Sequence, residues 1–195
     1  MSLMSQTVSI VLAAVVVAVV AVCAFAFRAQ AQSRPQGKAD PAIYQDLRAQ
    51  AFGGSRAAFG LPAGSSPAEP WGVIMDSSFT DGGSYTVVAI VDGSASIYLS
   101  SGGGFMGGIA HDNIRKAAKA MVNAGTTLQS KMAPTTSFPL PKGGETSFYL
   151  LTDAGLFGAT ASEQALVREH HALSPLFFAA QEVITQYRLI NERKN

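Results

Sequence analysis

A long apolar stretch near the N-terminus, residues 8–27, constrains this chain more than any other feature of its sequence. It reads VSIVLAAVVVAVVAVCAFAF, carries no charge, and has Ser9 as its one ordinary polar side chain. A helix rises about 1.5 Å per residue, so the stretch would span roughly 30 Å, the thickness of a bilayer's hydrocarbon core. Lipid offers the backbone no other hydrogen-bond partner, so even a valine-rich segment becomes helical there. The sequence therefore predicts a single transmembrane helix.

The residues around this stretch favour an uncleaved anchor over a secretory signal. A signal peptide has basic residues before an apolar core of roughly 7–15 residues. Residues 1–7 contain no Lys or Arg, and the apolar stretch is longer than such a core. Ala-x-Ala sequences at 24–26 and 29–31 match cleavage sites. A domain that is exported and released by cleavage is therefore the alternative.

Basic residues follow the apolar stretch and none precedes it. Arg28, Arg34 and Lys38 all lie within residues 28–39. Lys and Arg are enriched on the cytoplasmic side of membrane helices. This asymmetry predicts a cytoplasmic C-terminal domain, with a periplasmic or extracellular location as the alternative. The only cysteine, Cys23, lies inside the stretch, so the chain cannot form an internal disulfide, which is expected for a cytoplasmic domain but is also common in bacterial periplasmic ones.

Composition divides the rest of the chain into a linker and one domain. Residues 28–70 are rich in Ala, Gly, Ser and Pro and are predicted to be a flexible linker. A short helix near 41–52 interrupts this linker, because Asp40 is a favourable N-cap and Pro41 suits the first helical position. The sequence leaves open whether this helix packs on the domain. The compact domain is predicted to cover residues 71–195.

Within this domain the residue pattern predicts strands and helices in the order β-β-β-α-β-β-α. Turn signals such as Asp92-Gly93 join consecutive strands into antiparallel hairpins. We therefore expect an α+β fold of two layers, in which helices cover a mainly antiparallel five-stranded sheet. The predicted strands are residues 72–76, 85–91, 94–100, 147–151 and 156–160, and the predicted helices begin near residues 109, 162 and 174.

One predicted strand, residues 94–100, has an apolar face and a polar face. Side chains alternate along an extended chain, so residues two apart share a face. The apolar set is Ala95, Ile97 and Leu99, and the polar set is Ser94, Ser96, Tyr98 and Ser100. The polar face is predicted to meet water or a partner.

A glycine-rich loop, residues 100–108, is the best candidate for a ligand site. It is predicted to join a strand to a helix, so its amides and the positive end of the helix dipole are suited to a phosphate or nucleotide-like anion. The spacing Gly-x-Gly-x-x-Gly matches a dinucleotide fingerprint, but that motif needs a parallel βαβ unit and a hairpin precedes this loop. The predicted anion-binding residues are Ser100, Ser101, Gly102, Gly103, Gly104, Gly107, Gly108, Arg115 and Lys116.

The other polar residues predict no catalytic site, no metal site and no cofactor. His111 and Asp112 lie near two serines, but the start of a helix disfavours a charged histidine. His170 and His171 are adjacent, and adjacent helical side chains point about 100° apart, which prevents them from sharing one metal ion. A net charge of +1, without a basic run, argues against nucleic-acid binding.

These observations predict a non-enzymatic function. The chain is expected to be a single-pass membrane protein whose domain binds a protein partner or associates with itself. The predicted contact surfaces are the polar face of residues 94–100 and the final helix. The first alternative is a sensor or enzyme that binds a small anionic ligand at the glycine-rich loop. The second alternative is a cleaved, exported periplasmic domain.

Overall fold

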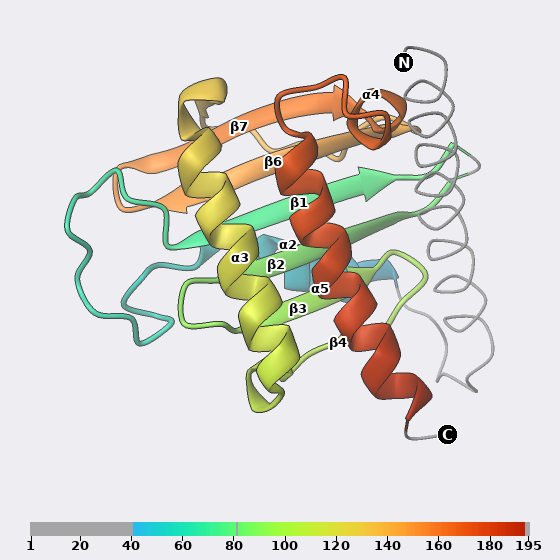
Figure 1. The fold of residues 1–195 in the computed structure, drawn as a ribbon, viewed down its shortest axis with the longest axis horizontal. Coiled ribbons are helices and arrows are strands. Elements are labelled where there is room, and N and C mark those ends of the chain that lie inside the picture. The colour runs from blue at the N-terminus through green and yellow to red at the C-terminus, as the bar shows by residue number, and fades with distance from the viewer. Residues whose placement is uncertain (1–40, 81, 194–195) are drawn as a thin grey trace, which may run out of the picture.

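The computed structural model describes residues 41–80 and 82–193 of the chain (Figure 1). The predicted transmembrane stretch, residues 8–27, and the predicted linker as far as residue 40 lie outside these ranges. Among the helices inside them, none is long and apolar enough to cross a membrane. The transmembrane helix of the predicted architecture therefore has no support in the structure.

The strands form one antiparallel sheet in the order β4-β3-β2-β1-β6-β7-β5. Their bounds are β1 Gly72–Ser78, β2 Ser84–Ile90, β3 Ala95–Leu99, β4 Gly104–Phe105, β5 Ala133–Thr135, β6 Glu145–Thr152 and β7 Gly155–Ser162. The predicted hairpin at Asp92-Gly93 is confirmed, since Gly93 has a φ of +99° and β2 pairs with β3. β1 pairs with β2 and β6, so it lies inside the sheet and all seven of its residues are buried.

The predicted five-stranded sheet is wrong in its strand number, because the sheet of the described chain has seven strands. The two additional strands lie at the two edges. β4 arises from the glycine-rich loop and β5 from a proline-rich connection, and they contain two and three residues. Strands this short, with Gly or Pro inside them, show no alternation of polar and apolar side chains. Pairing with a longer neighbouring strand, rather than local pattern, makes them extended.

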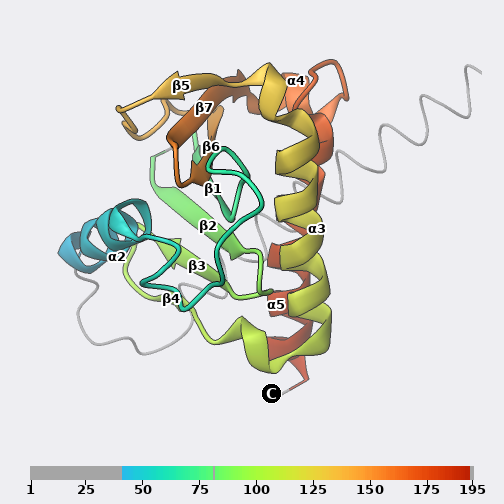
Figure 2. The ribbon, with the colours of Figure 1, turned by 90° about the vertical axis from the view of Figure 1, so that its left-hand side faces the viewer.

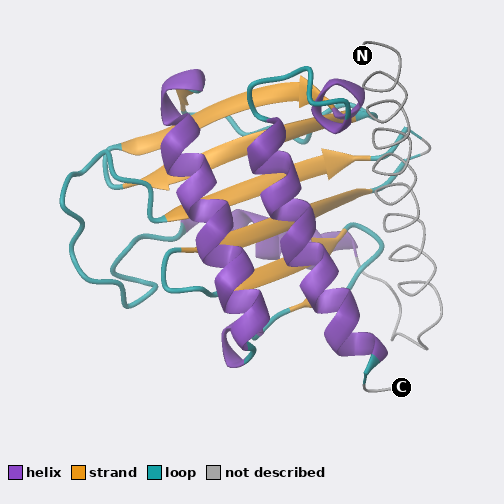
Figure 3. Ribbon diagram, viewed as in Figure 1, coloured by secondary structure: helices purple, strands orange, loops and turns teal. Residues whose placement is uncertain are grey.

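Two long helices, α3 Asp112–Leu128 and α5 Ser174–Glu192, lie side by side across one face of the sheet (Figures 1 and 3). The short helix α4, Glu163–Val167, begins as predicted at Ser162, whose hydroxyl accepts a hydrogen bond from the Ala165 amide at 3.3 Å. Short 3₁₀ turns at Gly108–Ala110 and Gln129–Lys131 flank α3.

The larger hydrophobic core lies between the sheet and these two long helices. The final helix contributes an apolar face to this core, because Phe177, Ala180 and Val183 of α5 are fully buried. Gly125 lets α3 approach the sheet closely. A Cβ at this position would lie 2.7 Å from Cδ2 of Leu150 and 2.8 Å from Cγ2 of Val73.

A second hydrophobic core lies on the opposite face, where α2, Pro41–Gly53, packs against the sheet (Figure 2). The predicted two-layer arrangement is therefore wrong, because helices cover both faces. The physical reason is the composition of the central strands. Ile74, Val88 and Ile90 point away from α3 and α5, and α2 with its neighbouring loops removes them from water. The packing of this helix, which the sequence left open, is thereby settled.

Candidate functional site

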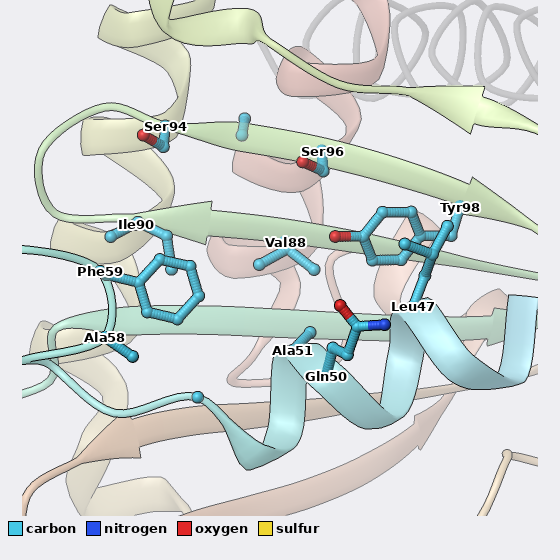
Figure 4. A pocket seen from close by; sticks show the side chains of 12 residues that line it. Leu47, Gln50, Ala51, Ala58, Phe59, Val88, Ile90, Ser94, Ser96 and Tyr98 are labelled. Atoms are coloured by element: carbon cyan, nitrogen blue, oxygen red, sulfur yellow. The ribbon is translucent and has the colours of Figure 1, made fainter.

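A groove runs between α2 and β3 on the face of the sheet that α3 and α5 do not cover (Figure 4). Its volume is about 270 Å³. Val88 and Ile90 of β2 form its floor, and α2 and β3 form opposite walls. The residues that line it are Leu47, Gln50, Ala51, Gly54, Ala58, Phe59, Val88, Ile90, Ser94, Ala95, Ser96 and Tyr98.

Three of the four residues on the predicted polar face, Ser94, Ser96 and Tyr98, line this groove; Ser100 does not, and Ala95 of the predicted apolar set also lines it. Ile97 and Leu99 belong instead to the core beneath α3 and α5. The alternation read from the sequence therefore places the polar face beside a hollow. On the α2 wall, Ala51 is small enough to leave that hollow open.

Phe59 stands at one end of the groove and is positioned by its neighbours (Figure 4). Its ring lies so close to Gly54 that a Cβ there would overlap Cε2 of the ring. The ring centroid lies 5.5 Å from that of Trp71. Phe59 remains 38% exposed, whereas Trp71 is buried, and its indole Nε1 has no hydrogen-bond partner among the described residues. Phe59 thus separates the groove from the only tryptophan of the chain.

The groove offers hydroxyl and amide groups but no charge. Among the described residues that line it there is no Asp, Glu, His, Lys or Arg, and the one titratable group is the Tyr98 hydroxyl. Burial raises the pKa of the Tyr98 hydroxyl, and a hydrogen bond with Ser96 opposes this rise. The Ser94 hydroxyl donates to Oδ2 of Asp92 at 2.9 Å. Gln50 is exposed on the α2 wall, across the groove from Ser96 (Figure 4). The lining is therefore suited to apolar contact supplemented by hydrogen bonds.

A buried ion pair attaches the α2 wall to the sheet. Arg48 of α2 donates from Nε and Nη2 to Oδ2 of Asp76 at 3.0 and 2.6 Å. Asp76 lies in β1 with 0% of its surface exposed, and its Oδ1 accepts a hydrogen bond from Thr86 Oγ1 at 2.6 Å. Burial raises the pKa of Asp76, and the Arg48 guanidinium and the Thr86 hydroxyl oppose the rise. The pair holds α2 at one position against β1 and β2.

The same arginine attaches residues 136–144, the proline-rich connection between β5 and β6. Nη2 of Arg48 also donates to the carbonyl oxygen of Phe138. The Phe138 ring stacks on Phe52 with a centroid distance of 4.2 Å, and the guanidinium carbon lies 4.8 Å from the Phe52 ring centre. This face of α2 was not predicted from the sequence. The signal for it is the recurrence of Tyr44, Arg48 and Phe52 every four residues, which places them on one side of a helix.

The structure divides the predicted anion-binding residues between a tight turn and the start of α3. Residues 100–103 form the turn between β3 and β4, in which Gly102 and Gly103 have φ of +87° and +82°. The Gly102 amide donates to the carbonyl oxygen of Leu99 at 2.9 Å. The Ser100 hydroxyl accepts from the Ser84 amide at 2.7 Å, and Ser101 is exposed. Residues 100–103 therefore form and stabilise the turn between β3 and β4.

The remaining glycines of the loop permit close packing. Gly104 lies in β4, where a Cβ would overlap the carbonyl oxygen of Ile97 on β3. Gly107 adopts a φ of +79° before the 3₁₀ turn. Gly108 lies directly against the Tyr187 hydroxyl of α5 and has no room for a side chain. Each of these glycines therefore has a structural reason to be present.

The two predicted basic residues lie in the first turns of α3. Arg115 forms an ion pair with Asp112 and donates to the carbonyl oxygen of Ile109 at 3.0 Å, and Lys116 is exposed. Two small hollows lie beside the start of α3, and none of the predicted anion-binding residues lines either of them. These hollows are lined by Phe105, Met106, Ala110, His111, Asp112, Asn113, Tyr187, Ile190, Asn191 and Arg193. The anion site stays a prediction from the sequence.

The histidines noted in the sequence lie apart from the groove. His111 precedes α3 as its N-cap residue without a side-chain capping bond. Nδ1 of His171 accepts a hydrogen bond from the Leu173 amide at 3.2 Å. Across the described ranges, no three residues of the types His, Cys, Asp and Glu gather closely enough to hold a metal ion.

The chain was compared with protein-family models, curated proteins and solved structures. No model of a protein family, no curated protein and no solved structure matches this chain.

Proposed function

We propose that this chain is a non-enzymatic protein-binding module and that the groove between α2 and β3 is its binding site. One observation carries the proposal: the polar face of β3 borders an open hollow with an apolar floor instead of facing bulk water alone. Val88 and Ile90 are buried at its base, while Ser96 and Gln50 remain accessible at its walls. Concave sites with apolar floors and a few polar groups are where proteins bind other molecules.

The chemistry of the lining also favours binding over catalysis. Its described residues contribute hydroxyls, one amide and apolar groups, with no Asp, Glu, His, Lys, Arg or Cys, and burial raises the pKa of the one titratable group, the Tyr98 hydroxyl, further above neutral pH. General acid–base catalysis needs a titratable group within hydrogen-bond reach of the reacting atoms. The sequence predicted the final helix as a second contact surface, but its apolar face is buried in the larger core. The proposal therefore rests on the groove. Membrane attachment and a cytoplasmic location stay predictions from the sequence.

Photo-crosslinking in cells that express the full chain tests this function. A benzophenone amino acid in place of Gln50 stands at the groove wall, and one in place of Asn123 stands on the exposed side of α3 as the control. We expect a discrete adduct from position 50 and none from position 123. Ser96→Arg, which directs a long charged side chain into the groove, should abolish the adduct.

The exposed position Ser137 supplies the matched control, because Ser137→Arg adds the same charge away from the groove. This variant should keep the adduct. An adduct of twice the chain mass identifies self-association, and any other mass identifies a different partner. Adducts that are equal at positions 50 and 123, or that persist in a folded Ser96→Arg variant, would contradict the proposal.

A further inference from the structure

We propose that the groove receives one large, uncharged side chain of a partner segment that crosses the groove in an extended conformation. This inference rests on the proposed function and specifies its ligand. The occupant is an apolar anchor residue, of the size of phenylalanine or leucine, together with the peptide groups on either side of it.

The size of the groove favours a single side chain. Small-molecule and cofactor sites usually have volumes of about 300–1,000 Å³. The groove has about 270 Å³ and lies open along the sheet surface. A nucleotide would also bring phosphate charges, and the described lining has no Lys, Arg or His to meet them. One large side chain, by contrast, would cover the floor formed by Val88 and Ile90.

The absence of charge in the lining selects an uncharged occupant. A lysine or glutamate side chain entering the groove would leave water without meeting an opposite charge among the described lining residues. The nearby acid, Asp92, is engaged by the amide and the hydroxyl of Ser94 at 2.7 and 2.9 Å. An apolar side chain loses no such hydration and gains contact with Leu47, Val88 and Ile90.

The polar groups at the two walls favour an extended segment over a helix. Gln50 on α2 and Ser96 on β3 face one another across the groove (Figure 4). The Gln50 amide can donate and accept, as a peptide group can. A helix has already satisfied its backbone internally, whereas an extended segment presents free N–H and C=O groups. The walls therefore suit the backbone of an extended segment, and the floor suits its anchor side chain.

Trp71 provides a built-in reporter of occupancy. It is the only tryptophan, and its ring contacts Phe59 at the end of the groove. A side chain that enters the groove presses on Phe59 and changes the surroundings of the indole. Methyl NMR signals of Leu47 and Ala51, which line the groove directly, give a second readout that does not depend on Phe59.

The test titrates the full chain with N-acetyl N-methylamides of phenylalanine, leucine, lysine and glutamate. The phenylalanine and leucine amides should shift the Leu47 and Ala51 methyl signals saturably and change Trp71 fluorescence. Compounds this small bind with a Kd of about 1 mM or weaker. The lysine and glutamate amides should bind at least about tenfold more weakly, because their charges would be unpaired.

Variants of the groove distinguish binding of the apolar side chain from hydrogen bonding to the peptide groups beside it. Gln50→Leu should weaken the phenylalanine amide about threefold to tenfold by removing one hydrogen-bonding group. Ser96→Arg should abolish the methyl shifts, and Ser137→Arg should leave them unchanged.

Two results would overturn the inference. One is charged amides that bind as tightly as apolar ones, and the other is methyl shifts that survive in Ser96→Arg. If no apolar amide moves the methyl signals while the crosslinked adduct at position 50 still depends on Ser96, the extended apolar segment is wrong and the binding function stands. If that adduct is also insensitive to Ser96→Arg, both proposals fail.

Discussion

Arg48→Met should destabilise this protein more than any change on its surface, because it leaves a buried carboxylate without its charge partner. Asp76 has 0% exposure and receives two hydrogen bonds from Arg48 and one from Thr86. Methionine keeps much of the side-chain volume but removes the charge and all three of the arginine's hydrogen bonds, two to Asp76 and one to the carbonyl oxygen of Phe138. Removing one partner of a buried ion pair costs about 3–5 kcal/mol. Single domains have a total stability of about 5–15 kcal/mol, so this is a large fraction.

Urea denaturation of the full chain, followed by Trp71 fluorescence, measures this cost. With an m-value of about 2 kcal/mol/M, a loss of about 4 kcal/mol lowers the midpoint by about 2 M. The matched control is Glu192→Gln, which breaks the surface pair between Arg188 and Glu192 on α5. Helical surface pairs of this spacing contribute about 0.3–0.5 kcal/mol. Asp76→Asn added to Arg48→Met should restore part of the midpoint, because the amide carries no charge into the interior.

The pH dependence gives an independent check. Without Arg48, only the Thr86 hydroxyl opposes the burial that raises the pKa of Asp76. A carboxyl whose folded pKa exceeds its unfolded pKa binds a proton on folding, so its destabilising effect grows as pH rises through that interval. Arg48→Met should therefore regain stability as pH falls from 7 towards 5, relative to the native chain. A cost close to that of Glu192→Gln, or no change with pH, would refute this account of the ion pair.

Three further changes test the fold. Gly125→Ala should lower stability by about 1–3 kcal/mol through overlap with Leu150 and Val73, whereas Gly53→Ala, with nothing within 4 Å, should be neutral in thermal melts. Gly104→Ala should open the β3–β4 pairing, seen as faster hydrogen exchange of the Ile97 amide with unchanged exchange in β6. Burial raises the pKa of Glu163 above 4.5. NMR titration should show this, and between pH 4.5 and 7 the native chain should lose stability relative to Glu163→Gln, because the raised pKa favours the neutral folded form. An ordinary midpoint for Glu163 would contradict the burial argument.

Local pattern predicted much of the sheet and missed its edges. The Asp92-Gly93 hairpin and the start of α4 at Ser162 depend on residues within a few positions of one another, and both are confirmed. The edge strands β4 and β5 are extended because a neighbouring strand pairs with them. Their glycine and proline residues signal turns when read alone. The strand number was therefore wrong for a physical reason, namely that edge pairing is a non-local interaction.

The candidate site shows the same limit. The alternation of residues 94–100 predicted one of its walls, because a polar face is a property of one strand. The other wall required the position of α2, which depends on Arg48 and Asp76, 28 residues apart in the chain. No local sequence pattern predicts that the side chains of Arg48 and Asp76 form an ion pair. The sequence predicted an anion site in the glycine-rich loop. In the structure, Gly104 packs against Ile97 and Gly108 against Tyr187, and only the folded chain brings these residues together.

The sequence by itself determined the conformations that neighbouring residues dictate: the hairpin at Asp92-Gly93, the helix start at Ser162 and the two-sided character of β3. The tertiary structure alone decided the number of layers, the edge strands and the groove. The reason is that turns, caps and alternation arise from short-range sterics and hydrogen bonds. A hollow between α2 and β3 exists only after long-range burial has brought the helix to the second face of the sheet.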